Sequence, residues 1–404
     1  MRSRFVSIDD MKAHAERVLP RMVFDFLEGG AQDEITMRAN EADFASICLN
    51  QRVWVDTQQI TLSTVMLDDS VSIPLFISPV GGLTAFRPIG DLAMAAAAHE
   101  AGVVFIHSAW SGYPLEEVLE VAPRSWVQIA FWAVEAETAR HRDRAKAAGV
   151  ETLVVAADAG QLGKRERDLR HGLSLPPRPP LRDYLDTALH PGWVARAAIG
   201  RKLTWGNVTL DGRPLRISEM TPWMDRHRTT STTWESLRQL RSKWSGRLVV
   251  KGVMCASDAT AAADIGADAV IVSNHGGRQL DSLPSTIAAL PSIAEAVGQR
   301  MEIYLDGGIR RGADIAKAIA LGANAVGIGR PAAYGLAVGG QKGIGHVLEL
   351  LSQEMHNTLS FLGATSIADL GPDILWDSPF RANPELGRRT PHPSPAPNKQ
   401  RSQR

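Results

Sequence analysis

The strongest constraint on the fold is an alternation of short apolar segments with alanine-rich amphipathic segments, which begins at residue 74. The expected strands are 74–78, 103–108, 126–131, 152–157, 248–252, 269–273, 302–306 and 325–329. Most are almost continuously apolar, as strands buried on both faces of a parallel sheet are. The segments between them, such as DLAMAAAAHEAG and GADIAKAIALGA, predict helices, several ending at a glycine. Eight such units in succession predict an α/β fold, a (β/α)8 TIM barrel, rather than an open doubly wound sheet.

The chain departs from the regular barrel repeat in three places. Residues 1–73 contain two expected helices, DDMKAHAERVL and PRMVFDFLEGG, and predict an N-terminal helical extension. The fourth and fifth strands start 96 residues apart (152 to 248), which indicates an insertion after strand 4 at about 170–235. We expect a long loop with one or two helices that covers the active site, the alternative being a solvated or oligomer-contacting excursion. One barrel domain over 1–377 would then precede a Pro-rich, basic, disordered tail over 378–404.

Composition excludes several classes of protein. The 44 basic residues balance 44 acidic ones, which argues against a nucleic-acid partner, because such proteins need a surplus of Lys and Arg. Cys48 and Cys255 lack metal-ligand spacing, so neither a disulfide scaffold nor a metal site is expected. The chain shows no secretory signal and no apolar run long enough for a transmembrane segment. We therefore predict a cytoplasmic protein, with peripheral membrane association through the Trp- and Arg-rich insertion left open.

Polar and charged residues gather at the carboxyl ends of the expected strands, where barrel enzymes have their active sites. These residues are Ser108, Trp110, Gln128, Asp158, Lys251, Ser273, His275, Arg278, Asp306, Gly308, Arg310, Gly329 and Arg330. The opposite strand ends show nothing comparable. The sequence thus predicts one site at this rim of the barrel.

Two of these loops combine glycine and arginine at the start of a helix. They are DGGIRRGADI after the seventh expected strand and GIGRPAAYG after the eighth. Backbone N–H groups, the helix dipole and guanidinium groups together favour an anion, and barrels commonly hold a phosphate there. The alternative is a pair of solvated arginines.

The remaining rim residues suggest acid–base chemistry on an anionic substrate. His275 leaves a buried strand in SNHGGRQLD, and Asp158 at a nearby strand end could pair with it as a general base. Arg278, with Arg165 of LGKRERD, could hold a substrate carboxylate through paired hydrogen bonds. Lys251 lies inside the apolar strand LVVKG, where an ammonium is costly unless it meets an anion. A Schiff-base lysine, a counter-charge to a cofactor and a lysine reaching solvent at the strand end are the three interpretations.

Taken together, SNHGGRQLD, LDGGIRRGADI, LVVKGV, GIGRP and LGKRERD resemble the FMN-dependent α-hydroxy-acid oxidase and dehydrogenase family, which includes glycolate oxidase, L-lactate dehydrogenase and mandelate dehydrogenase. The resemblance covers about residues 5–370. It implies FMN as cofactor and oxidation of a 2-hydroxy acid to a 2-oxo acid, with hydride passing to flavin N5. Removal of the α-proton first, to give a carbanion, is the alternative order. It also implies a homotetramer and an electron acceptor that is either oxygen or a quinone or other carrier.

The resemblance assigns roles to individual residues. His275 would be the catalytic base with Asp158 raising its basicity, while Arg278 and Arg165 would bind the substrate carboxylate. Lys251 would lie near N1 and O2 of the flavin. The other cofactor contacts it implies are Pro79, Val80, Gly81, Ser108, Gln128, Ser273, Asp306, Gly308, Arg310, Gly329 and Arg330.

The chain also departs from the family pattern around the substrate. Trp110 matches an aromatic position of the family's substrate pocket, but Phe26 and Ala130 stand where tyrosines are usual, and Ala156 replaces a threonine. These changes remove hydroxyl donors and open volume, so we expect a substrate bulkier and less polar than lactate or glycolate. Gly81 stands where oxygen-using members often have alanine, a weak indication of a dehydrogenase.

Two other functions are compatible with this sequence. One is a flavin-dependent oxidase that acts on an amine or lactam-like substrate in a natural-product or modified-peptide pathway. The other is a non-redox barrel that binds a phosphorylated metabolite or merely binds FMN.

Overall fold

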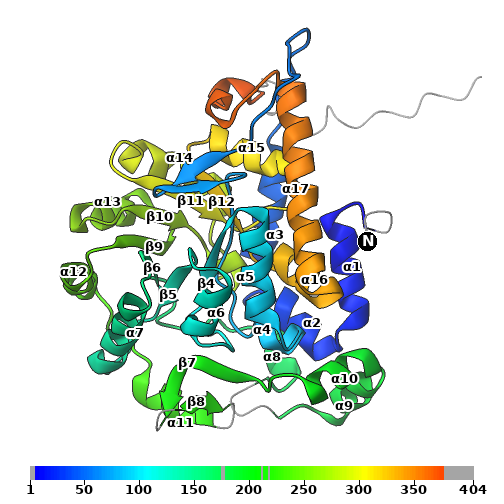
Figure 1. Cartoon of the computed structure of the whole chain (residues 1–404), viewed down its shortest axis with the longest axis vertical. Helices are drawn as coiled ribbons and strands as arrows, with labels where there is room; N and C mark the ends of the chain where they lie inside the picture. The colour runs from blue at the N-terminus through cyan, green and yellow to red at the C-terminus, as the bar shows by residue number, and fades with distance from the viewer. Residues whose placement is uncertain (1–4, 174–177, 211–212, 217–218, 377–404) are drawn as a thin grey trace, which may run out of the picture.

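The computed structural model describes residues 5–173, 178–210, 213–216 and 219–376. Within these residues, eight parallel strands form a closed barrel (Figure 1). In barrel order they are β3 (Leu75–Ile77), β4 (Val104–His107), β5 (Trp126–Ile129), β6 (Thr152–Ala156), β9 (Arg247–Val253), β10 (Ala269–Val272), β11 (Glu302–Asp306) and β12 (Ala325–Ile328). The expected barrel is confirmed, and each strand lies within two residues of its expected bounds. The expected tail over 378–404 lies outside the described residues.

Helices connect the strands and cover the outside of the barrel (Figure 1). They are α4 (Leu83–Phe86), α5 (Gly90–Ala101), α6 (Leu115–Val121), α7 (Glu135–Ala147), α12 (Trp234–Lys243), α13 (Ala256–Ile265), α14 (Thr286–Val297), α15 (Gly312–Ala320), α16 (Arg330–Gly339) and α17 (Gln341–Leu362), followed by the 3-10 turns η3 (Ile367–Asp369) and η4 (Pro372–Ile374). Gly102 and Gly266 end α5 and α13 in the left-handed conformation, with φ of 66° and 88°. The glycines therefore end these helices as the sequence predicts.

The N-terminal extension contains the two expected helices, α1 (Ile8–Val18) and α2 (Arg21–Glu28). A third helix, α3 (Ile35–Ser46), was not predicted, because two of its three buried residues are polar and give no apolar stripe. A hairpin of β1 (Thr64–Met66) and β2 (Asp69–Val71) was also not predicted. Its side chains pack with the barrel interior and close the amino-terminal end of the barrel.

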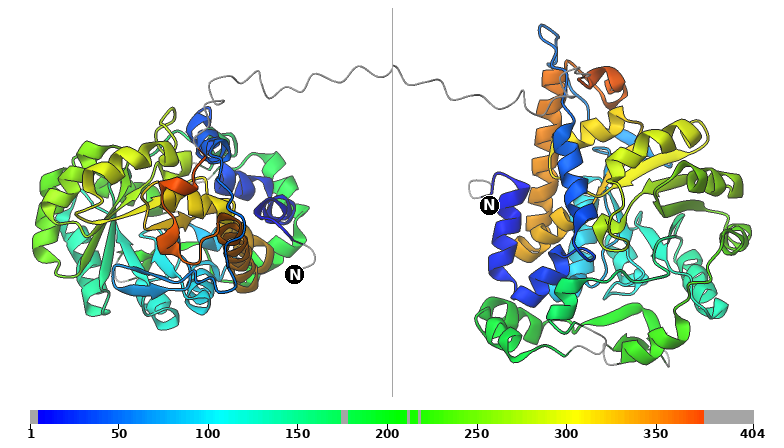
Figure 2. Two further views of the ribbon diagram at one scale, coloured as in Figure 1. Left: turned by 90° about the horizontal axis from the view of Figure 1, so that it is seen from above. Right: turned by 180° about the vertical axis from the view of Figure 1, so that it is seen from behind.

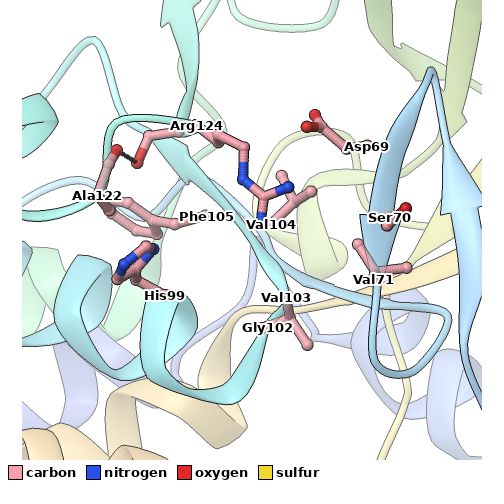
Figure 3. Close-up of a pocket in the computed structure, with 11 residues that line it drawn as sticks. Asp69, Ser70, Val71, His99, Gly102, Val103, Val104, Phe105, Ala122 and Arg124 are labelled. Atoms are coloured by element: carbon pink, nitrogen blue, oxygen red, sulfur yellow. Dashed lines mark hydrogen bonds between the residues drawn. The ribbon is translucent and has the colours of Figure 1, made fainter.

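A cavity lies beside this hairpin, at the opposite end of the barrel from the predicted active site. It is lined by His99, Arg124, Asp69 and the first residues of β4, and Figure 3 shows these side chains around the start of the strand. A second hollow, lined by Asp68, Arg247 and their neighbours, lies at the same end. Both are at the amino ends of the strands, whereas the predicted site is at the carboxyl ends.

The insertion after β6 is more ordered than the loop with one or two helices that the sequence predicts. It contains α8 (Glu166–Arg170), α9 (Leu181–Ala188), α10 (Pro191–Ile199), β7 (Thr204–Leu210), β8 (Arg213–Arg216) and α11 (Met220–His227). Figure 1 shows it, in green, at the lower end of the molecule together with α2. The insertion folds locally because it has a small core of its own, formed by Val208, Leu215, Met220, Trp223 and Met224.

A buried ionic cluster attaches the insertion to the N-terminal extension. The ring nitrogens of His171 lie 2.8 Å from Asp25 Oδ2 and 2.9 Å from Asp183 Oδ2. Asp25 belongs to α2 and Asp183 to α9, and the three side chains are buried. Because buried charges are tolerated only when paired, this cluster ties α9 to α2.

Candidate active site

The inward-facing side chains of the barrel change from apolar to polar along each strand. The apolar layer contains Phe76, Ile106, Trp126, Val154, Val249, Ile271, Tyr304 and Ala325. Side chains in a strand alternate between faces, so the next inward position is two residues further on. Those positions are Ser78, Ser108, Gln128, Ala156, Lys251, Ser273, Asp306 and Gly327. All but the alanine and the glycine are polar, so the carboxyl end of the barrel is lined by a polar layer.

One half of the polar layer is a charged hydrogen-bonded network centred on Asp306. Lys251 Nζ lies 2.7 Å from Asp306 Oδ2 and donates to Ser273 Oγ at 2.6 Å. The Ser273 hydroxyl donates to Asp306 Oδ1 at 2.5 Å, and Ser78 donates to Oδ2 at 3.0 Å. Lys251 is only 3% exposed. The structure therefore shows a buried lysine paired with a carboxylate rather than one that reaches solvent.

The other half of the layer is neutral. Ser108 Oγ and the backbone N–H of Ala109 both donate to Gln128 Oε1 at 3.3 Å. The backbone N–H of Trp110 donates to Ser108 Oγ, which fixes the loop after β4. A Cβ on Gly81 would lie 2.8 Å from Trp110 Cβ, so any larger residue at this position would displace the tryptophan.

His275 and Asp158 form a pair above the polar layer. His275 Nδ1 lies 3.1 Å from Asp158 Oδ2, and the two residues are 117 positions apart in the chain. Burial by itself would raise the pKa of Asp158, but the charge and hydrogen bond of His275, with Lys251 nearby, hold this pKa below its usual value. Asp158 is therefore a carboxylate at neutral pH and orients the imidazole so that Nε2 is left for a substrate.

The backbone around His275 is strained and held from outside the barrel. His275 has a φ of 57° within a 3-10 turn, η2 (His275–Gly277). The preceding Asn274 forms two amide hydrogen bonds of 2.8 Å with Asn40 of α3. A left-handed non-glycine residue persists only where its surroundings enforce it. Asn40 is thus a supporting residue that the sequence analysis missed, and no motif in this chain marks it.

Two arginines meet beside this pair. Arg278 Nη1 donates to the carbonyl of Gly29 at 2.6 Å, and its guanidinium carbon lies 5.4 Å from the ring centre of Phe26. Arg165 Nε approaches the backbone carbonyl of Arg278 at 3.4 Å. Burial, reinforced by repulsion from Arg165 and Arg330, lowers the pKa of Arg278 well below its usual value. Since none of these three arginines forms an ion pair within the described residues, a bound anion would relieve the repulsion.

A second basic group lies where the sequence predicts a phosphate. Arg330 donates to the carbonyls of Gly276 and Gly29 at 2.9 and 3.0 Å, and Arg310 pairs with Glu41 at 2.7 Å. Burial, with the charge of Arg310 among the further causes, lowers the pKa of Arg330. Gly329 precedes α16, and no side chain caps the first N–H groups of this helix. These donors and cations are chemically suited to a phosphate.

The remaining cofactor positions predicted from the sequence lie nearby. Pro79 and Val80 follow directly after β3 and Ser78, and a Cβ on Gly329 would contact Val80 at 3.6 Å. A Cβ on Gly308, whose φ is 90°, would lie 2.1 Å from the carbonyl oxygen of Asn40, so no side chain fits there. The loops after β3 and β12 thus lie close together, and the loop after β11 packs against α3. We call these three loops the cradle.

Phe26 and Ala130, which stand where the family pattern has tyrosines, lie beside other aromatic residues. Phe26 extends from α2 and contacts Gly82, and Ala130 follows β5 with its carbonyl near Thr138 Oγ1. Trp132, two residues beyond Ala130, lies 5.2 Å from Trp110 between ring centres. The sequence analysis did not single out Trp132, and the aromatic-rich segment FW after Ala130 was the signal that could have found it.

The site thus combines a polar barrel layer, a phosphate cradle and an imidazole–carboxylate pair. A family profile described as FMN-dependent dehydrogenase matches residues 15–377. The chain belongs to this FMN-dependent dehydrogenase family. It is an FMN-dependent oxidoreductase of the α-hydroxy-acid type.

Similar proteins agree with this assignment. The chain is 40% identical over 371 residues to an L-lactate dehydrogenase of Pseudomonas putida (strain GB-1), covering 91% of this chain and 97% of that protein. It is similar to the crystal structure of the monotopic membrane protein (S)-mandelate dehydrogenase, with a TM-score of 0.87, 36% identity, and coverage of 93% and 100% of the two chains. A mandelate oxidase solved with (S)-4-hydroxymandelic acid has a TM-score of 0.79, 33% identity and coverage of 92% and 98%.

The residues of this chain fit FMN. The cradle of Gly308, Gly329, Arg310 and Arg330 would present donors and cations to a phosphate, and the buried ammonium of Lys251 lies in the polar layer at the same end of the barrel. The neutral side of the polar layer offers amide and hydroxyl groups to the edge of a heterocycle. The charge on the half-buried Arg165, Arg278 and Arg330, none of which forms an ion pair within the described residues, is the observation that most clearly favours an anionic partner.

Proposed function

We propose that this enzyme oxidises a 2-hydroxy acid bulkier than lactate to the 2-oxo acid, with His275 as the catalytic base. The observation that carries the proposal is the 3.1 Å contact between His275 and Asp158 beside Arg278 and Arg165, neither of which lies within ion-pair distance of a carboxylate among the described residues. Bound FMN supplies the acceptor for the two electrons lost from the α-carbon. Phe26 and Ala130 support a large, weakly polar substrate, because neither presents a hydroxyl.

Each side chain of the site has its own role in the proposed reaction. Arg278 and Arg165 bind the substrate carboxylate and thereby aim the hydroxyl at the imidazole. His275 takes the hydroxyl proton at Nε2, and the ionised Asp158 stabilises the imidazolium that results. Lys251, which is held by Asp306, would supply positive charge to the bound cofactor.

For reoxidation we propose a quinone or other carrier rather than oxygen. Gly81 and the dehydrogenases among the similar proteins support this choice. The homotetramer implied by the resemblance stays a prediction. An amine or lactam-like substrate is less well supported, because the similar proteins are named for lactate and mandelate.

Anaerobic reduction of the bound flavin tests the proposed function. The panel contains lactate, glycolate, (S)-mandelate, 2-hydroxyoctanoate, and amine and lactam compounds. We expect bleaching of the flavin by the larger hydroxy acids and slow bleaching by lactate and glycolate, after which a soluble quinone restores the colour faster than oxygen. Bleaching by the amines or lactams alone would overturn the proposal.

We also propose that the enzyme attaches peripherally to the cytoplasmic side of a membrane through α9 and α10. Exposed apolar residues on these helices are Leu181, Tyr184, Leu185, Val194 and Ile199, and Leu189 follows directly after α9. Leu189 and Ile199 are 79% and 89% exposed. Arg182 and Lys202 are exposed beside them. Figures 1 and 2 show both helices at an outer corner of the molecule beside α2. No helix within the described residues is long and apolar enough to span a membrane. The similar mandelate dehydrogenase described as monotopic supports surface attachment.

Leu189→Glu combined with Ile199→Glu is expected to weaken vesicle binding at least about tenfold, because each lost apolar contact with lipid contributes roughly 1.5–3 kcal/mol. Co-sedimentation with phosphatidylethanolamine–phosphatidylglycerol vesicles measures this. Phe361→Glu is the matched control, since Phe361 is 65% exposed on α17, away from the insertion. Equal binding by all three proteins would refute the attachment site.

A further inference from the structure

We propose that the insertion supplies a wall of the substrate pocket through Trp223, and that this wall, with Trp132, selects 2-hydroxy acids that carry an aromatic side chain. The inference rests on the proposed function and identifies the substrate class. It concerns side chains that the sequence motifs do not assign.

Two tryptophans place the wall at the rim of the polar layer. The backbone N–H of Trp110 is bonded to Ser108 Oγ, and the N–H of Gly82 donates to the carbonyl of Trp110 at 3.1 Å. Trp132 stands edge-on to Trp110, with ring centres 5.2 Å apart and planes at 83°. Both are half-buried, so part of each side chain is left uncovered by the rest of the protein.

The insertion contributes the next ring. Trp223 of α11 lies edge-on to Trp132, with ring centres 4.6 Å apart and planes at 85°. The His227 ring stacks on the Trp223 ring, with ring centres 4.2 Å apart and planes only 4° apart. Trp223 is 6% exposed, so its position is set by packing and not by solvent. An aromatic array therefore continues from the barrel rim into the insertion.

Backbone hydrogen bonds hold the insertion at this distance. The N–H of Ala133 donates to the carbonyl of His227 at 2.7 Å, which joins the end of α11 to the loop after β5. On the other side, the N–H of Gly206 donates to the carbonyl of Ser111 at 2.9 Å, and Asn207 Nδ2 donates to the carbonyl of Ser108 at 3.2 Å. The insertion is thus fastened to the loops that carry Trp110 and Trp132.

The loop after β5 fixes the backbone of both Ala130 and Trp132. Thr138 Oγ1 accepts the N–H of Trp132 at 3.0 Å and donates to the carbonyl of Ala130 at 3.4 Å. Ala130 stands where the family resemblance implies a tyrosine, so this strand end carries no phenolic hydroxyl, and the next side chains along the loop are the apolar aromatics Phe131 and Trp132.

This chemistry favours an aromatic occupant. Aromatic rings attract one another in edge-to-face or offset arrangements, which contribute about 0.5–1.5 kcal/mol beyond the burial of apolar area. A methyl group as small as that of lactate leaves the wall largely uncovered. The neighbouring side chains Met220 and Met224 are apolar and deformable, which suits rings of different size.

The test compares kcat/KM for (S)-mandelate with kcat/KM for lactate in four proteins. These are the unaltered enzyme, Trp132→Leu, Trp223→Ala and the conservative Trp223→Phe. We expect the ratio to fall at least tenfold in Trp132→Leu and Trp223→Ala and to be largely restored in Trp223→Phe. Trp376→Ala is the control, because Trp376 is 50% exposed and lies after η4, outside the site.

Trp132→Leu keeps the test decisive if Trp223→Ala disturbs the core of the insertion, because Trp132 is only half-buried. The affinities of the oxidised protein for phenylglyoxylate and pyruvate can be measured from changes in the flavin absorbance spectrum. This readout does not depend on turnover. The proposed wall would be overturned if the ratio of the two kcat/KM values stayed unchanged in both Trp132→Leu and Trp223→Ala with flavin bound, the latter being compared with Trp223→Phe. Failure of every hydroxy acid to bleach the unaltered enzyme would instead refute the proposed function.

Discussion

Replacing His275 by alanine is expected to lower the rate of anaerobic flavin reduction by about 10²- to 10⁴-fold while FMN stays bound. The imidazole is paired with Asp158 through Nδ1, which leaves Nε2 for the proposed substrate. The cofactor cradle is formed by other residues, chiefly around α16 and Asp306. Stopped-flow absorbance of the flavin and the flavin-to-protein ratio measure the two effects separately.

His99→Ala is the matched control, because His99 is exposed at the opposite end of the barrel (Figure 3). A His275→Ala protein that reduces its flavin at the unaltered rate would remove His275 as the base. Because the pKa of Asp158 is held below its usual value of about 3.8, protonation of Asp158 should not reduce activity until the pH falls below that value. The stability that ionised Asp158 contributes is lost only as the pH falls through that lowered pKa.

Lys251→Met is expected to lower the free energy of unfolding by about 3–5 kcal/mol and to empty the cofactor site. Lys251 is the cation within 3 Å of the buried Asp306, and methionine keeps the length of the side chain but not its charge. The carboxylate would keep its hydroxyl partners Ser273 and Ser78 but lose its counter-charge. Chemical denaturation of the protein and its flavin content are the measurements.

The double variant Lys251→Met with Asp306→Asn separates stability from cofactor binding. It is expected to recover much of the lost stability, because no buried charge is left unpaired, while FMN binding stays weak. The deficit of the single variant should also shrink as the pH falls, since an unpaired buried carboxylate takes up a proton. A single variant as stable as the unaltered protein at pH 7 would contradict the pairing argument.

The expected site residues were recognisable because the barrel gathers them by a simple rule. Lys251, Ser273 and Asp306 each stand two residues after an inward apolar residue of the same strand. The strand pattern and the polar residue at its end are both local features of the sequence. The rim as a set was therefore predictable, although the hydrogen bonds within it were not.

Other parts of the site could not be predicted from local pattern. Asn40 contacts Asn274, which lies 234 positions away in the chain, and α3 has no apolar stripe by which the sequence would predict it. Tryptophans are often found in the hydrophobic core, so Trp132 and Trp223 carry no functional signal in the sequence, and only the fold shows that they are in contact. Such contacts depend on where whole elements dock, which residue spacing does not specify.

The sequence by itself determined the barrel, its two additions, the cofactor family and the rim that carries the chemistry, because strand and helix periods and short motifs are read within a few residues. Only the tertiary structure decided how the N-terminal extension and the insertion close over that rim. It paired His275 with Asp158, set His275 in a left-handed conformation against α3, and brought Trp223 to Trp132. These outcomes depend on packing between segments far apart in the chain, where burial and hydrogen bonding of both partners are decided together.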